Sequence, residues 1–325
     1  MTHLCVSIFV TDLAKAKRDI TTAAEAGADM VELRVDGFSD GTLLESLIRE
    51  AIMPVIVTCR PEWEGGHSQL GDVERSSILT HAADAGAHYV DLELATARRR
   101  PSELRHAVAG RINSRTKLIL STHHFTSRPS RLSNLVVELN QSLADIAKIV
   151  WLARTIRDNL EAFEILQTRV KPTIALCMGE AGLISRVLAK KFGGFLTFAS
   201  LSTDSATAPG QISIHDLKHL YRWDAIQPTT RVYGVVGSPI MHSMSPAIHN
   251  AAFAETGIDA VYLPLLVNPG YESFKAFMES FLHFPALDLS GLSITIPHKE
   301  NALRYLTDQG AVIEPLARRI GAVNT

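Results

Sequence analysis

Lys148 is the residue whose surroundings point most directly to chemistry. It lies in the apolar run Asp145–Leu152. Burial disfavours the charged form of an amine, so a lysine in such a run must find a counter-charge or become partly neutral. A neutral amine can attack a carbonyl carbon and form an imine. Lys148 is therefore a candidate Schiff-base nucleophile, although this segment alone favours a strand-end lysine that reaches solvent or pairs with a carboxylate.

Eight short apolar segments recur through the first two hundred residues and would position such a group. They are Leu4–Val10, Met30–Val35, Pro54–Cys59, Tyr89–Leu94, Lys117–Thr122, Ile146–Leu152, Thr173–Cys177 and Phe195–Ala199. Most are apolar throughout, which is typical of strands buried on both faces. Helical spacing is found between them, in Asp12–Ala26, Gly41–Ala51, Glu74–Ala85, Ser130–Leu143, Ile156–Val170, Glu180–Phe192 and Ser213–Tyr221, with a short piece near Ser102–Ala109. The alternation predicts an α/β fold, a (β/α)8 TIM barrel, with a doubly wound sheet as the alternative.

Polar residues recur where these predicted strands end. Glu32 and Arg34 lie in the second strand, Arg60 follows the third, His123 ends the fifth, Arg186 follows the seventh and Gln211 the eighth. Barrel loops build active sites at that edge, so charges there are expected for catalysis and not for packing. Three alternatives stay open: an ion pair between Glu32 and Arg34, a satisfied core histidine at position 123, and a surface arginine at position 186.

The pattern changes near residue 227. Gln227–Thr230 is typical of a linker, and a second set of strands and helices follows. Strands are expected at Val232–Gly237, Val261–Leu266 and Gly291–Ile296, and helices at Pro246–Gly257, Glu272–Phe281 and Lys299–Thr307. We therefore expect a barrel over 1–226, a linker over 227–230 and a smaller α/β domain over 231–325.

Composition narrows the class of protein. The chain has 325 residues, 46% of them hydrophobic, and a formal net charge of −2. This balance gives no reason to expect nucleic acid or a membrane surface as partner. The three cysteines are far apart in apolar runs, as expected for buried thiols in a reducing, cytoplasmic location. Small molecules are the expected partners, and the sequence leaves a homodimer open.

Six motifs in the barrel region occur in one order. They are Val31–Asp36, Cys59-Arg60 with Glu64-Gly65-Gly66, Ser121-Thr122-His123, Ala144–Lys148, Met178-Gly179 with Ser185-Arg186, and Ala208–Gln211. Each is weak alone. Together, over about residues 3–222, they resemble type I 3-dehydroquinate dehydratase, a Schiff-base barrel enzyme of the shikimate pathway. The resemblance implies conversion of 3-dehydroquinate to 3-dehydroshikimate and water, with no metal or dissociable cofactor.

The resemblance also implies a role for each residue. The substrate is a 3-ketone with a β-hydroxyl, and an iminium on Lys148 would acidify the intervening carbon. His123 would remove that proton and then protonate the hydroxyl, because imidazole titrates near neutrality. Glu64 would orient His123, and Arg186 would hold the substrate carboxylate through a bidentate pair. The remaining contacts are implied for Ser7, Glu32, Arg34, Arg60, Thr207 and Gln211.

Three residues depart from the family's pattern. His124 stands where Asp or Asn is usual, Thr122 replaces an aromatic residue, and Thr207 replaces the lid serine. Thr207 keeps a hydroxyl group. His124 bears on the pH optimum more than on the reaction class.

The second unit carries a resemblance of its own. Tyr233–Asn250, Ser293–Lys299 and Gly321–Thr325 resemble the substrate domain of shikimate dehydrogenase. That resemblance implies that Ser243 and Ser245 bind a substrate carboxylate, that Lys299 is the acid/base for a hydroxyl, and that Thr295 and Asn324 position the ring. For the two serines alone, a turn and a helix cap before Pro246 would explain them equally well.

The sequence offers no nucleotide motif beside this unit. No G-x-G-x-x-G occurs, so NADP is expected only for a part of the dehydrogenase that these residues do not include. Because the chain stops inside a family motif, we expect it to be truncated. Two further hypotheses stay open: a class I aldolase-type barrel that uses the same lysine, and a second unit that binds its ligand without catalysis.

Overall fold

Eight parallel strands form the larger unit. The computed structural model describes residues 1–38, 40–101, 116–202, 210–321 and 323. The strands are β1 (His3–Phe9), β2 (Met30–Arg34), β3 (Val55–Thr58), β4 (Tyr89–Glu93), β5 (Lys117–His124), β6 (Ile146–Leu152), β7 (Thr173–Met178) and β8 (Leu196–Ala199). They pair in the order β7-β6-β5-β4-β3-β2-β1-β8. The circle closes where the Phe195 N–H donates to the Thr173 carbonyl at 2.8 Å, so the predicted (β/α)8 barrel is confirmed.

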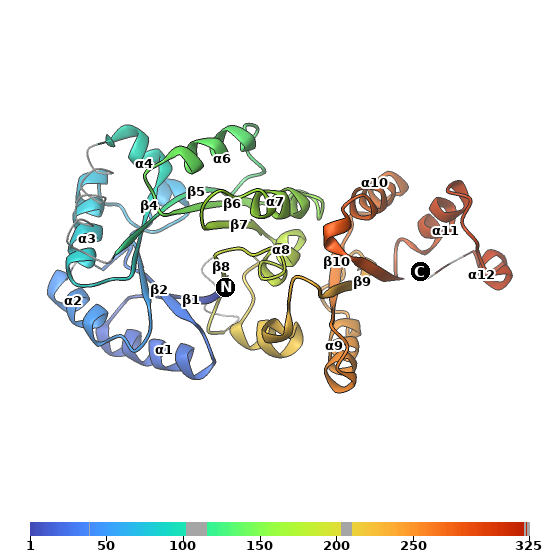
Figure 1. The fold of residues 1–325 in the computed structure, drawn as a ribbon, viewed down its shortest axis with the longest axis horizontal. Coiled ribbons are helices and arrows are strands. Elements are labelled where there is room, and N and C mark those ends of the chain that lie inside the picture. Colours follow the sequence, from blue (N-terminus) through green and yellow to red (C-terminus); the bar gives the residue numbers. More distant parts are fainter. Residues whose placement is uncertain (39, 102–115, 203–209, 322, 324–325) are drawn as a thin grey trace.

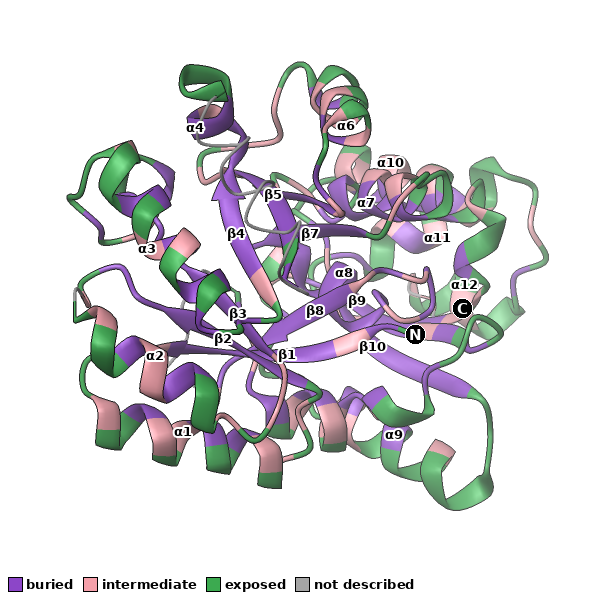
Figure 2. Cartoon of the chain, turned by 60° about the vertical axis from the view of Figure 1, so that its left-hand side comes forward, coloured by how far each residue is buried: buried purple, intermediate pink, exposed green. Residues whose placement is uncertain are grey.

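Helices surround this sheet and cover its apolar strands. They are α1 (Leu13–Glu25), α2 (Gly41–Glu50), α3 (Asp72–Asp84), α4 (Leu94–Arg99), α6 (Leu132–Gln141), α7 (Asp158–Gln167) and α8 (Leu183–Val187). Figure 2 shows buried strands inside and helices whose outer faces are exposed. Aspartates fix two helix starts, because Asp12 accepts the Lys15 N–H at 2.8 Å and Asp40 caps α2 in the same way.

Two predicted helices are shorter or of another type. The predicted helix Glu180–Phe192 consists of a 3-10 turn, η3 (Glu180–Gly182), followed by the five residues of α8. The turn is tight because a Cβ on Gly182 would lie 2.6 Å from the Cys177 carbonyl carbon. The predicted helix Ser213–Tyr221 contains a π-helix, η5 (Asp216–Leu220). The predicted piece near Ser102–Ala109 lies outside the described residues.

The second unit is a small parallel α/β layer. Its strands are β9 (Arg231–Gly237), β10 (Ala260–Leu266) and β11 (Leu289–Ile294), in the order β10-β9-β11. Its helices are α9 (Ser245–Thr256), α10 (Tyr271–Leu282), α11 (Lys299–Asp308) and α12 (Pro315–Ile320). All of these except α12 follow the predicted pattern.

The second unit packs against the α7–α8 side of the barrel (Figure 1). Lys191, which is 6% exposed, donates from Nζ to the carbonyls of Pro228 and Thr230 at 2.9 and 2.8 Å. Arg157 donates from Nε to the Ser280 hydroxyl at 2.8 Å. Phe163, Phe192 and Phe284 form an aromatic cluster across the boundary. The two units are therefore joined by packed side chains and hydrogen bonds as well as by the connecting segment.

The structure also bears on membrane-spanning helices and on the state of the three cysteines. Among the described residues, no helix is both long and apolar enough to cross a bilayer. Cys5, Cys59 and Cys177 are buried free thiols, and burial raises the pKa of each thiol.

Candidate active site

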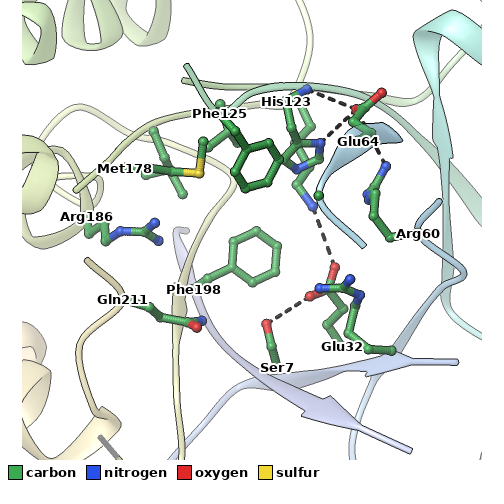
Figure 3. Close-up of a pocket in the computed structure, with 15 residues that line it drawn as sticks. Ser7, Glu32, Arg60, Glu64, His123, Phe125, Met178, Arg186, Phe198 and Gln211 are labelled. Carbon is green, nitrogen blue, oxygen red and sulfur yellow. Dashed lines mark hydrogen bonds and ion pairs between the residues drawn. The ribbon is translucent and has the colours of Figure 1, made fainter. Parts of the chain in front are cut away.

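A pocket of about 510 Å³, measured out to its open mouth, lies inside the barrel at the carboxyl ends of the strands. Its lining consists of Ser7, Glu32, Arg34, Arg60, Glu64, Gly65, His123, Phe125, Lys148, Val150, Leu176, Met178, Arg186, Phe198 and Gln211. Figure 3 shows these side chains converging from several strands. The pocket therefore brings together all the barrel residues predicted for the site, except Thr207, which lies outside the described residues.

Lys148 is buried, and it has the counter-charge that its apolar run requires. Its Nζ lies 2.9 Å from Asp91 Oδ2 and 3.6 Å from Glu32 Oε1. The Phe198 ring covers the ammonium from the other side, with its centroid 4.5 Å from Nζ. The residue is only 3% exposed, so the alternative of a lysine reaching solvent is wrong and the alternative of pairing with a carboxylate holds.

Glu32 is part of this lysine site and does not pair with Arg34. Its carboxylate accepts hydrogen bonds from Ser7 Oγ at 2.8 Å and Thr58 Oγ1 at 3.0 Å. Arg34 bonds instead to Asp36, at 2.5 Å from Nη2 and 3.2 Å from Nε. The alternative of a Glu32–Arg34 ion pair is therefore wrong, because each of these two described side chains has its own partner.

His123 and Glu64 form the second reactive pair of the pocket. His123 Nδ1 lies 2.9 Å from Glu64 Oε1, and the same oxygen accepts the His123 backbone N–H at 2.9 Å. Glu64 is held in place by a tight turn: Gly65 has φ +74°, and a Cβ there would meet the Phe125 ring at 2.2 Å. Phe125 in turn stacks on the His123 imidazole with a centroid separation of 6.3 Å. Packing and hydrogen bonding thus fix the orientation of the imidazole.

Burial drives both members of this pair towards their neutral forms. Desolvation lowers the pKa of His123 well below its usual value, and the charges of Arg60 and Lys148 lower it further. Desolvation raises the pKa of Glu64 to about 8, against the opposing charge of Arg60. An imidazole with a lowered pKa is uncharged at neutral pH and can accept a proton.

Asp91 and Glu93 were missed by the sequence analysis, although they organise the floor of the site. Arg60 donates to Asp91 Oδ1 at 2.7 Å and to Glu93 Oε1 and Ser121 Oγ at 2.9 Å each. Burial would raise the pKa of Asp91, but Arg60 and Lys148 hold it well below its usual range. The available signal was the pair of carboxylates two residues apart in an otherwise apolar strand, which places both on one face of β4.

Arg186 is the buried cation of the pocket. It is 2% exposed, it forms no ion pair within the described part of the chain, and its Nε is buried there without a hydrogen-bond partner. Desolvation lowers its pKa to about 10. The surface-arginine alternative is therefore wrong. A buried guanidinium beside a cavity is suited to an anionic group of a ligand.

The second unit brings its own candidate residues to one edge of the three-stranded sheet. Ser243 and Ser245 follow β9, and Thr295 and Lys299 follow the neighbouring strand β11. The Ser245 N–H donates to Ser243 Oγ at 3.3 Å. The end of β9 lies against Thr295, because a Cβ on Gly237 would meet Thr295 Cγ2 at 2.5 Å. Asn324 lies outside the described residues.

The described residues contain no group of three His, Cys, Asp or Glu side chains that could hold a metal ion. The barrel pocket thus presents a buried lysine, a buried arginine, and a buried carboxyl group paired with a partly buried histidine. These groups, at the carboxyl ends of (β/α)8-barrel strands, can form an imine, transfer a proton and bind an anion.

Comparison with known proteins gives the family. Residues 4–228 match the model of type I 3-dehydroquinase, and residues 235–325 match that of the shikimate dehydrogenase substrate binding domain. The chain therefore belongs to the type I 3-dehydroquinase family, and its C-terminal part resembles the shikimate dehydrogenase substrate-binding domain.

The chain is similar both to bifunctional proteins that carry the two units and to proteins that consist of the dehydratase alone. A bifunctional 3-dehydroquinate dehydratase/shikimate dehydrogenase from Arabidopsis thaliana is 40% identical over 99% of this chain, which spans only 52% of that relative. A 3-dehydroquinate dehydratase from Desulfotalea psychrophila is 35% identical over 60% of this chain and 87% of its own length. The solved dehydroquinate dehydratase and shikimate dehydrogenase from S. pombe AroM has a TM-score of 0.58 at 26% identity, over 99% of this chain and 61% of its own.

Proposed function

We propose that the barrel dehydrates 3-dehydroquinate to 3-dehydroshikimate through an imine on Lys148. The observation that supports this most directly is the meeting of Lys148, the His123–Glu64 pair and the buried Arg186 in one pocket. Each group matches one feature of the substrate. The ketone meets the lysine, the C–H bond and β-hydroxyl meet the histidine, and the carboxylate meets the arginine.

The first step is attack of the Lys148 amine on the ketone carbon. The ammonium must first lose a proton, and His123, kept neutral by burial, is a base in the same pocket that can accept it. His123 returns that proton to the carbinolamine hydroxyl, which leaves as water to give a cationic iminium, and His123 is neutral again. Asp91, 2.9 Å from Nζ, stabilises that cation as it stabilises the resting ammonium.

Elimination then uses the iminium as an electron sink. Neutral His123 takes the proton from the carbon between iminium and hydroxyl, and the C–H electron pair moves into an enamine. The imidazolium returns its proton to the departing β-hydroxyl, which leaves as water while the new C=C bond forms. Glu64 Oε1, 2.9 Å from Nδ1, accepts the hydrogen bond of the ring and holds its orientation between the two transfers. Water then hydrolyses the conjugated imine and frees the lysine.

The remaining barrel residues have supporting roles in this proposal. Arg186 holds the substrate carboxylate, and Gln211, Ser7 and Arg34 contact its hydroxyls; Thr207 is included on the sequence resemblance alone. Glu32 orders Lys148. Arg60, whose guanidinium already bonds to Asp91, Glu93 and Ser121, acts mainly by holding those groups, so direct contact with substrate is its lesser role.

For the second unit we propose binding of a shikimate-type carboxylate, with Ser243 and Ser245 on the carboxylate and Thr295 and Asn324 on the ring. Lys299 would exchange the hydroxyl proton. Hydride transfer would require NADP on a further domain. We also propose that the boundary between the two units falls at 227–230. We propose a reducing compartment, such as the cytoplasm, as the location of the protein. A homodimer stays open, and size-exclusion chromatography with light scattering would measure the oligomeric state.

Borohydride trapping tests the covalent step. The chain is incubated with 3-dehydroquinate and borohydride, digested, and mapped by mass spectrometry. We expect a reduced adduct on the peptide that contains Lys148. Lys191 is an internal control, because it is also buried but donates to backbone carbonyls away from the pocket.

The variant His123→Ala separates imine formation from elimination. His123→Ala should still form the adduct while elimination slows by about 10²-fold or more. An adduct on another lysine would overturn the assignment of Lys148. A folded chain that neither forms an adduct nor consumes 3-dehydroquinate would overturn the proposed function.

A further inference from the structure

Among the residues that the structure describes, no acidic side chain pairs with Arg186 to fix its position. It lies in α8, a helix of five residues, which is too short to be stable by its own hydrogen bonds. Its guanidinium is buried, with Nε unbonded among the described residues. The location of this group must therefore come from the packing and hydrogen bonding of the backbone that carries it.

Asn159, the second residue of α7, supplies those hydrogen bonds. Its amide oxygen accepts the Ser185 backbone N–H at 3.1 Å, one residue before Arg186. Its amide nitrogen donates to the Ala181 carbonyl at 2.7 Å and to the Ile156 carbonyl at 2.6 Å. Asn159 is 0% exposed. One side chain from α7 thus holds both ends of the turn that leads into α8.

The Ser185 hydroxyl completes the arrangement. It donates to the Gly182 carbonyl at 2.8 Å and accepts the Cys177 N–H, also at 2.8 Å. Ser185 is fully buried. The turn is therefore tied to the end of β7 by the serine and to α7 by Asn159, which leaves Arg186 as the first side chain free to reach the pocket.

We infer that Asn159 is a positioning residue for Arg186, and through it for the carboxylate of the substrate. The inference rests on the proposed function, since it assumes an anionic ligand in the barrel pocket. Asn159 does not line the pocket, so it acts only through the turn. A shift of about 1 Å in a substrate-holding group can cost about 10²-fold in rate.

A double-mutant cycle measures this coupling. Wild type, Asn159→Leu, Arg186→Ala and the double variant are compared by kcat/KM for 3-dehydroquinate, followed by the ultraviolet absorbance of the conjugated product. We expect Asn159→Leu to lower kcat/KM by about 10- to 10²-fold, mainly through KM. In the Arg186→Ala background the same change should cost less than about threefold.

Asn250 provides a matched control. It is a buried asparagine of the second unit whose amide makes a similar pair of backbone bonds, to the Tyr262 carbonyl and from the Tyr262 N–H, at 2.8 Å each. Asn250→Leu should leave the kcat/KM of the barrel within about threefold of wild type. If Asn159→Leu fails to fold, Ser185→Ala, which removes only the hydroxyl, enters the same cycle.

The outcomes are distinct. Equal losses from Asn159→Leu with and without Arg186 would mean a general structural role and overturn the inference alone. A wild-type chain that does not consume 3-dehydroquinate would overturn the proposed function and the inference with it. A loss confined to the background that contains Arg186 would establish the coupling.

Discussion

Glu64 gives the sharpest test of the electrostatics, because the structure assigns its carboxyl a pKa of about 8 in place of the usual 4.5. The folded protein then keeps a proton that the unfolded chain releases above pH 4.5. Folding takes up a proton throughout that window, so the free energy of unfolding falls as pH rises from 4.5 to 8. At about 1.4 kcal/mol per pH unit the full effect is about 5 kcal/mol.

Glu64→Gln removes this titration while keeping an amide oxygen for the His123 N–H. Between pH 7 and pH 9 the wild type should lose about 1.4 kcal/mol that the variant retains. Asp91, whose pKa lies well below its usual range, stays ionised across that interval in both proteins. We therefore expect the variant to gain stability relative to wild type as pH rises, while its turnover falls.

Urea unfolding at pH 7, 8 and 9 measures the difference. The three tryptophans, Trp63, Trp151 and Trp223, all lie in the barrel region, so their fluorescence reports the unfolding of that unit. Parallel pH profiles for the two proteins, within about 0.3 kcal/mol, would show that Glu64 is ionised in the folded state and refute the reasoning.

Three further changes probe the same site. Lys148→Ala should reduce turnover to below a hundredth of wild type while circular dichroism shows the fold intact; retention of a tenth of the rate would rule out the imine. Asp91→Asn should destabilise the barrel by about 3–5 kcal/mol, because it leaves Arg60 and Lys148 short of a buried counter-charge; thermal unfolding and the rate of adduct formation report it, and unchanged values would contradict its role. Gly65→Ala should cost about 1–3 kcal/mol and lower kcat/KM at least tenfold, because a Cβ there meets Phe125; steady-state kinetics comparable to wild type would show that the turn does not position Glu64.

Part of this site could be predicted from the sequence because its residues are polar or charged while the residues around them are apolar. Lys148 and His123 stand in apolar strands, where a polar side chain needs a specific reason. The eight strands were found because they are apolar on both faces, as in parallel sheets covered by helices. Those two patterns predict the barrel and a reactive lysine inside it, whereas the role of His123 is implied only by the family resemblance.

The partners of these residues could not be predicted in the same way. Asp91 lies 57 residues from Lys148 and 31 from Arg60 in the chain, and only closure of the barrel brings the three together. Local spacing left open an ion pair between Glu32 and Arg34, whereas the register of β1 and β2 places Glu32 opposite Ser7, and the Thr58 hydroxyl of β3 donates to its carboxylate. Pairing across strands depends on register, which the pattern of one strand does not contain.

The contact between the two units has a consequence for each unit on its own. Phe163 and Phe192 stack at 4.1 Å beneath Phe284, which comes from the second unit. Lys191 is buried on carbonyls of the connecting segment. Separation of the units at 227–230 would expose the rings of this phenylalanine cluster to water, which is unfavourable. It would also remove the carbonyl groups to which the buried Lys191 donates its hydrogen bonds. Each unit therefore completes the surface of the other, and we expect either unit expressed alone to be less soluble and less stable than the joined chain.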